Sequence, residues 1–191
     1  MVYFIICVLL TFIAFIELSL FIYLGEYMTC VVIKHQPPFV ATSMSVQRKL
    51  VKYIQEHYKD VKLICEIGSG YGDMARYIGQ KTGASVIALE NMPLSAFISK
   101  TKDLFQKKSQ TIKCDAFDYL KKTQKKFDLA IAYLSPKHTT KLLQFKSKFR
   151  TLISLDFEIE NYKPTKIIDC GPGFTTFNHK KYPHKMFIYE F

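Results

Sequence analysis

The sequence contains no tryptophan and only eight glycines among its 191 residues, and three of those glycines lie within five positions. Its five cysteines form no Cys-x-x-Cys pair, and its five histidines show no ligand spacing with cysteines or carboxylates. These absences argue against a disulfide framework and against a zinc site. We therefore expect no structural metal and a reducing environment for the folded part of the chain.

Positive charge is absent from the first 33 residues, although the whole chain has a formal net charge of +11. The apolar run Val2–Leu24 is long enough as a helix to cross roughly 30 Å of hydrocarbon. It has no basic residue before it and no small-residue cleavage site after it, unlike a secretory signal. Basic residues begin at Lys34, so the positive-inside rule predicts that the remainder lies on the cytosolic or an equivalent side. We predict a single-pass membrane anchor over residues 1–33 and a linker over 34–43.

The stretch CEIGSGYGD, residues 65–73, lacks the signatures of two common nucleotide sites. A triphosphate-binding loop requires Gly-Lys-Ser or Gly-Lys-Thr, whereas here Gly72 is followed by Asp73 and Met74. A dinucleotide loop requires G-x-G-x-x-G, and here the third glycine comes one position early. The stretch still predicts a turn from a strand into a helix, where bare backbone lets a ligand come close.

Residues 44–191 show alternating signals for helices and buried strands, typical of a single α/β domain. The predicted helices cover residues 44–58, 74–81, 94–107 and 139–149. The predicted strands cover residues 61–67, 84–90, 110–116, 127–134, 151–157, 165–170 and 185–191. The last two strands have no helix between them, which predicts a hairpin at the edge of the sheet. We expect a Rossmann-like three-layer sandwich with a mostly parallel seven-stranded sheet and a C-terminal edge hairpin, preceded by one transmembrane helix.

The pattern Glu66-x-Gly68-x-Gly70-x-Gly72 resembles the first motif of the class I, seven-β-strand, S-adenosylmethionine-dependent methyltransferases. The resemblance implies that the glycine loop wraps the methionine part of the cofactor. It also implies that Glu66 supports either the loop or the ammonium group of the ligand.

Two further acidic residues extend this resemblance. Glu90 ends the next predicted strand, 18 residues beyond Gly72, where the family binds the ribose hydroxyls. Asp115 follows the third strand, where the family has a residue near the adenine amino group. The resemblance implies S-adenosylmethionine as the cofactor, held by Glu66, Gly68, Ser69, Gly70, Gly72, Glu90, Asn91, Asp115, Ala116 and Tyr133.

Three segments outside this core resemble the membrane-anchored protein lysine methyltransferases that modify the ATP synthase c-subunit and the adenine nucleotide translocase, and their prokaryotic relatives. The segments are Pro38-Phe39-Val40-x-Thr42, Leu134-Ser135-Pro136 and Cys170-Gly171-Pro172-Gly173. This resemblance implies methylation of lysine in a membrane protein. It gives three substrate-side candidates: Phe39, Ser135 and Pro136.

The chain also departs from that family. It has Tyr71 where the family commonly has aspartate, Asp73 where it has arginine, and no tryptophan near the carboxyl terminus. A small-molecule, lipid or RNA methyltransferase therefore stays open, as does a non-catalytic basic module tethered to a membrane. The sequence YLSP stands where nucleic-acid aminomethylases have N/D-P-P-Y/F, which makes nucleic acid the less favoured substrate. No residue is assigned as general base.

Overall fold

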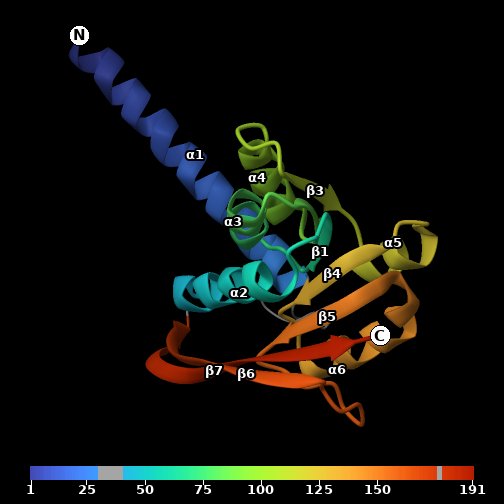
Figure 1. Cartoon of the computed structure of the whole chain (residues 1–191). Helices are drawn as coiled ribbons and strands as arrows, with labels where there is room; N and C mark the ends of the chain where they lie inside the picture. The colour runs from blue at the N-terminus through green and yellow to red at the C-terminus, as the bar shows by residue number, and fades with distance from the viewer. Residues whose placement is uncertain (30–40, 176–177) are drawn as a thin grey trace. The chain divides into compact units, whose positions relative to one another are not determined.

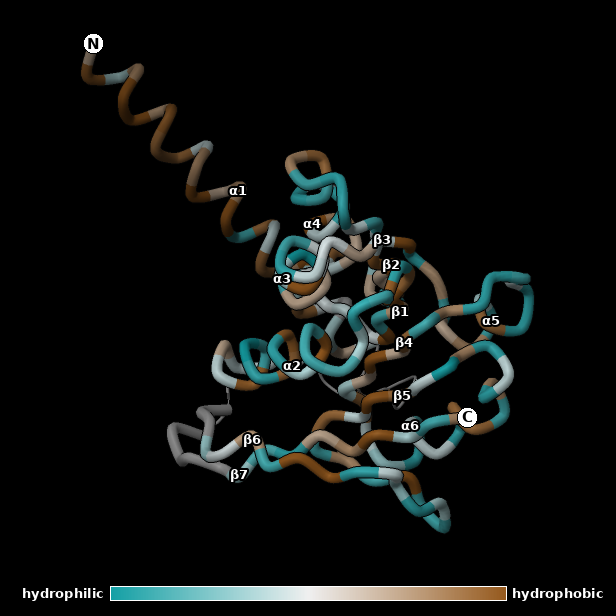
Figure 2. Tube along the Cα trace, viewed as in Figure 1, coloured by the Kyte–Doolittle hydropathy of each residue, from teal (hydrophilic) through white to brown (hydrophobic). Residues whose placement is uncertain are grey.

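A computed structural model describes residues 1–29, 41–175 and 178–191, and the chain divides into two compact units, Met1–Pro38 and Phe39–Phe191. The first unit contains helix α1 (Val2–Met28). Its apolar stretch Val2–Gly25 is 24 residues long, enough to cross a membrane, and the large hydrophobic side chains along it are exposed. Figure 2 shows the hydrophobic positions along this helix. Length and composition alone give this result, and an amino-terminal signal sequence has the same properties.

The second unit is built on one seven-stranded sheet with the order β3-β2-β1-β4-β5-β7-β6. The strands are β1 (Leu63–Ile67), β2 (Ser85–Glu90), β3 (Ser109–Lys113), β4 (Phe127–Ala132), β5 (Phe149–Leu155), β6 (Lys166–Thr175) and β7 (Asn178–Glu190). The first five are parallel to one another, whereas β7 runs antiparallel to both β5 and β6. The structure therefore confirms the predicted mostly parallel sheet and its C-terminal edge hairpin.

Helices cover both faces of the sheet (Figure 1). The helices of this unit are α2 (Met44–His57), α3 (Asp73–Thr82), α4 (Pro93–Asp103), α5 (Ala116–Lys122), α6 (Pro136–Lys141) and the 3₁₀ helix η2 (Leu142–Lys148). Successive residues of a strand point to opposite faces, so Ile64 packs with α2 and α3 whereas Cys65 packs with α5 and η2. The sheet is consequently buried on both sides, as its continuous apolar strands predict.

The structure corrects several predicted boundaries. Strand β4 ends at Ala132 and not at Leu134, and the edge hairpin is longer than predicted, with β6 continuing to Thr175 and β7 starting at Asn178. Helix α4 ends at Asp103 and not at Lys107, because the Asp103 carboxylate accepts a 2.6 Å hydrogen bond from the Thr111 N–H of β3. Strand β3 ends at Lys113, and the chain then starts α5, which the sequence analysis missed. The helix predicted over 139–149 is two shorter helices, with a non-helical backbone at Phe145.

Candidate functional site

The glycine loop connects β1 to α3 at the carboxyl edge of the sheet, and its three glycines all have positive φ. The φ values are 76° at Gly68, 55° at Gly70 and 68° at Gly72, a region that other residues rarely adopt. Space is limiting as well. A Cβ at Gly72 would overlap the Ser99 hydroxyl and lie 2.9 Å from Arg76 Nη1. Both backbone conformation and packing therefore require glycine at position 72.

The Glu90 carboxylate at the end of β2 holds this loop in place. Its Oε2 accepts a 2.6 Å hydrogen bond from the Gly70 N–H, and its Oε1 accepts one of 2.7 Å from the Met92 N–H. The N–H groups of Gly68 and Ser69 donate to the carbonyl oxygen of Leu89, at 2.9 and 3.0 Å. The loop is thus tied along its length to the end of the neighbouring strand.

Two buried polar atoms of the loop region have no hydrogen-bond partner among the described residues: Glu66 Oε2 and Ser69 Oγ. Glu66 is 3% exposed, and burial, with the nearby charge of Glu90, raises the pKa of its carboxyl to about 8. Burying a polar group without a partner is unfavourable. A carboxyl oxygen and a hydroxyl left unpaired beside a bare glycine backbone are what a site for a polar ligand offers.

The pKa of Glu66 predicts how stability depends on pH. Because its ordinary value of 4.5 rises to about 8 in the folded protein, folding favours the protonated form. The stabilisation is complete below pH 4.5 and is lost as pH rises through 8. We expect Glu66→Gln, which is neutral throughout, to remove a decline on the order of 4 kcal/mol. Urea unfolding of both proteins between pH 5 and pH 9, without ligand, measures the difference; parallel curves would contradict the raised pKa.

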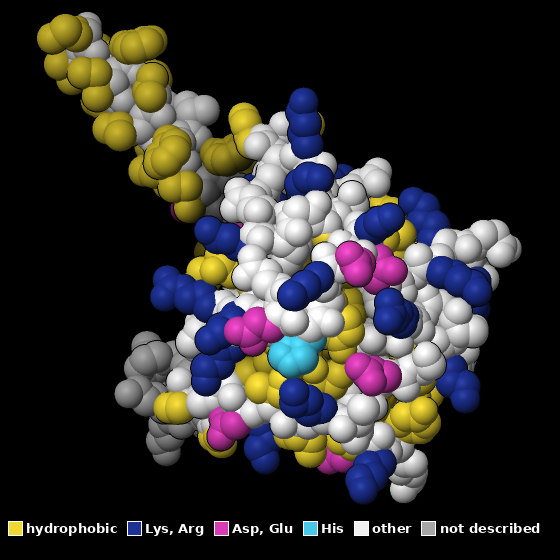
Figure 3. Space-filling view, viewed as in Figure 1, with side chains coloured by type: hydrophobic (Ala, Val, Ile, Leu, Met, Phe, Trp, Pro, Cys, Tyr) yellow, Lys and Arg dark blue, Asp and Glu magenta, His cyan; other side chains and the backbone are white. Residues whose placement is uncertain are grey.

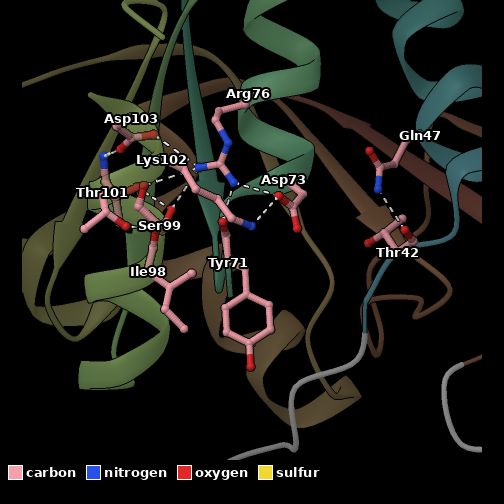
Figure 4. Close-up of polar contacts among 11 residues, drawn as sticks. Thr42, Gln47, Tyr71, Asp73, Arg76, Ile98, Ser99, Thr101, Lys102 and Asp103 are labelled. Carbon is pink, nitrogen blue, oxygen red and sulfur yellow. Dashed lines mark hydrogen bonds and ion pairs between the residues drawn. The ribbon is translucent and has the colours of Figure 1, made fainter. Parts of the chain in front are cut away.

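Arg76 in the first turn of α3 joins the glycine loop to α4 (Figure 4). Its side chain is only 11% exposed. Nη2 donates to the carbonyl oxygen of Tyr71 and to Asp73 Oδ1, the latter at 2.7 Å, while Nη1 donates to Asp103 Oδ1 at 3.3 Å. Lys102 of α4 also bonds Asp73, at 3.0 Å, and lies over the Tyr71 ring. Tyr71 and Asp73 are the two loop positions that depart from the family pattern. Both take part in the contacts by which Arg76 and Lys102 hold the loop against α4, and we call this group of contacts the Arg76 clamp.

Asp115 lies next to the end of β2, because the N–H of Cys114 donates to the Glu90 carbonyl oxygen at 2.9 Å. Its carboxylate caps α5, with Oδ1 accepting from the N–H groups of Phe117 and Asp118 at 2.8 and 3.1 Å. The other predicted positions on this side, Asn91 and Ala116, are half-buried and directly follow Glu90 and Asp115. The structure thus brings Glu90 and Asp115 to adjacent positions at one edge.

After β4, the structure places His138, which was not predicted as a site residue, beside the predicted Ser135. Ser135 precedes α6 and Pro136 is its first residue, as the Ser-Pro pair suggests. The Ser135 hydroxyl lies 2.8 Å from His138 Nδ1, a pair that sequence reasoning missed although its i, i+3 spacing in a first helical turn was visible. Burial and the charges of Lys141 and Lys137 lower the pKa of His138, so the imidazole is neutral at neutral pH.

Tyr133, at the end of β4, belongs to a second polar group. Burial and the adjacent Asp156 carboxylate raise its pKa well above the ordinary value, so the phenol stays protonated. Asp156 Oδ2 lies 2.6 Å from Nδ1 of His184, which is buried on β7. Phe39, the remaining substrate-side candidate, lies outside the described residues. Across residues 1–29, 41–175 and 178–191, no three His, Cys, Asp or Glu side chains are grouped to hold a metal ion.

No protein-family model and no curated protein matches the sequence. Solved structures do match the fold. An RNA methyltransferase from Salinibacter ruber, in complex with S-adenosyl-L-homocysteine, superposes with a TM-score of 0.61 at 15% identity, over 78% of this chain and 92% of that chain. Magnesium protoporphyrin IX methyltransferase from Synechocystis PCC 6803, with bound S-adenosylmethionine, gives 0.52 at 14% identity, over 74% and 76%. At these identities the likeness establishes a shared fold.

Proposed function

We propose that this chain is an S-adenosylmethionine-dependent methyltransferase. The observation that carries the proposal is the glycine loop with its two unpartnered buried atoms, Glu66 Oε2 and Ser69 Oγ, on a fold shared with proteins crystallised with this cofactor or its product. Glu66 and Ser69 would hold the amino-acid end of the ligand. Glu90, at the end of β2, would bind the ribose hydroxyls, and Asp115 would face the adenine amino group.

The cofactor supplies an electrophilic methyl group on a sulfonium, and the chain binds, orients and excludes water. An amine acceptor must lose its proton before it can attack. His138 suits this task, because its imidazole is neutral at neutral pH and the Ser135 hydroxyl fixes its orientation. Tyr133, kept protonated, can donate a hydrogen bond but cannot act as the base.

For the acceptor we propose lysine in a membrane protein. Helix α1, as an uncleaved anchor, would tether the enzyme beside such a substrate, with the folded domain on the cytosolic or matrix-equivalent side. A second candidate acceptor is RNA, favoured by the net charge of +11 and by the fold neighbour from Salinibacter ruber, described as an RNA methyltransferase. Figure 3 shows Lys and Arg side chains spread over the viewed face with acidic side chains between them. If RNA is the acceptor, its binding to this basic surface should weaken steeply as the salt concentration rises.

The test is methyl transfer to membranes from the source cell. The full chain in detergent is incubated with S-adenosylmethionine labelled in its methyl group, and protein, lipid and RNA are then separated. We expect the label in protein, recovered as methyl-lysine after acid hydrolysis. The same reaction with Glu90→Gln gives the background. Label in the RNA or lipid fraction and none in protein would refute the lysine assignment while leaving methyl transfer intact.

A further inference from the structure

Helix α4 and the turn after it expose three large apolar side chains. Among the described residues after α1, Phe105, Leu104 and Phe97 are the most exposed large hydrophobics, at 91%, 81% and 65%. The backbone at Leu104 is still helical, so Phe97 and Leu104, seven positions apart, lie on the same side of the helix. Figure 2 shows hydrophobic positions in the turn that projects beyond α4. Isolated exposed hydrophobics are common, but three on one element are not.

Exposed lysines lie close in sequence to these side chains. Lys100 lies between Phe97 and Leu104 on the same side of α4, and Lys107 and Lys108 follow in the turn. All three are exposed, and none forms an ion pair within the described part of the chain. We call this surface the α4 patch, made of Phe97, Lys100, Leu104, Phe105, Lys107 and Lys108.

The fold does not need this patch for its own packing. Helix α4 contacts the rest of the domain through small residues on its other side, Ser95, Ala96 and Ser99. Phe and Leu side chains rimmed by lysines match the chemistry of a bilayer surface, where apolar groups enter the boundary between headgroups and acyl chains and cations meet anionic headgroups. A nucleic-acid surface would use the lysines and leave the apolar side chains in water.

The short connection between α1 and α2 also favours a membrane as the surface that the α4 patch contacts. Phe105 lines a groove of about 410 Å³ together with Met44, the first residue of α2. Only 15 residues separate Met28, where α1 ends, from Met44. Such a segment spans at most about 55 Å, so an α1 that crosses a bilayer keeps the domain within reach of its surface.

We propose that the α4 patch docks on a membrane surface rich in anionic lipid. The proposal rests on the membrane-anchor part of the proposed function and is independent of methyl transfer. Docking would give the folded domain a fixed orientation toward the bilayer, which the tether alone does not.

The absence of tryptophan makes the test direct. The Phe105→Trp variant of the full chain carries one tryptophan and is reconstituted in nanodiscs of phosphatidylcholine, alone or mixed with phosphatidylserine. We expect its emission to shift to shorter wavelength in the mixed discs, and brominated acyl chains to quench it roughly threefold more strongly there. Ile167→Trp, at a 52% exposed apolar position on β6, is the matched control and should stay unquenched.

Two further variants show whether the membrane anchor or the docking is wrong if Phe105→Trp is not quenched. Phe12→Trp reports whether α1 is in the bilayer, so an unquenched Phe12→Trp overturns the anchor on which the proposal rests. If Phe12→Trp is quenched and Phe105→Trp is not, the docking proposal is wrong and the anchor stands. Replacing Lys100, Lys107 and Lys108 with glutamate in the Phe105→Trp protein should abolish the additional quenching by anionic discs. A blue shift without bromide quenching would overturn lipid docking.

Discussion

Replacing Gly72 with alanine is expected to lower cofactor affinity by more than about tenfold and to destabilise the domain. The backbone φ of 68° costs about 1–2 kcal/mol for a residue with a Cβ. The overlap with the Ser99 hydroxyl adds about 1–3 kcal/mol, because Ser99 is fully buried and bonded to Thr111 at 2.6 Å. Strain of this size, released by moving the loop, corresponds to a loss of affinity of more than about tenfold. Calorimetry of the full chain with S-adenosylmethionine and urea unfolding measure both effects.

Gly83→Ala is the matched control for this variant. Gly83 has a similar φ of 77° at the other end of α3, but a Cβ there meets no heavy atom within 4 Å. It should cost about 1–2 kcal/mol of stability and leave cofactor affinity unchanged. If the two alanine variants bind the cofactor equally well, the close approach of α4 to the loop has no role in cofactor binding.

The Glu90→Gln variant should lose cofactor affinity by about tenfold or more. Each carboxylate oxygen now accepts from one backbone N–H, of Gly70 and of Met92, and an amide can supply only one acceptor oxygen. One buried N–H then faces the amide NH₂, which costs about 1–3 kcal/mol and releases one side of the loop. If Glu90 also binds the ribose, the loss in the free energy of cofactor binding exceeds the loss in the free energy of unfolding.

Asp128→Ala supplies the comparison for Glu90→Gln. Oδ2 of the Asp128 carboxylate also accepts from two backbone N–H groups, of Lys62 and Leu63 at 2.8 and 2.9 Å, at the amino end of β1. Because one oxygen serves both donors, an asparagine oxygen could keep both bonds, and alanine is needed to remove them. Its replacement should lower stability without changing cofactor affinity, whereas Glu90→Gln changes both. Calorimetric titrations that leave Glu90→Gln with full affinity would remove Glu90 from the binding site.

The succession of strands along the chain and most of the glycine loop could be predicted because those signals are local, whereas the position of β7 between β5 and β6 could not. Buried parallel strands are continuous apolar runs, and the glycines stand where the backbone needs positive φ. Helices of only one or two turns were harder to predict. Helix α5 begins with one capping aspartate, Asp115, and has seven residues, which is too short for a helical period to be visible.

The polar groups that the sequence did not reveal are those assembled across elements. Asp156 and His184 lie 28 positions apart and meet only because β7 returns beside β5. The Arg76 clamp joins α3, the glycine loop and α4. No periodic pattern encodes such contacts, since they depend on strand register and on how helices pack over the sheet.

The position of β7 between β5 and β6 has a consequence for biosynthesis. Within the described residues β6 pairs with β7 alone, so neither β6 nor the open side of β5 can pair until β7 has left the ribosome. Helix α1 leaves much earlier in chain order. An insertion machinery would therefore meet α1 while the sheet still has an unpaired edge, and a nascent chain held at the membrane would face aggregation at that edge until β7 emerges.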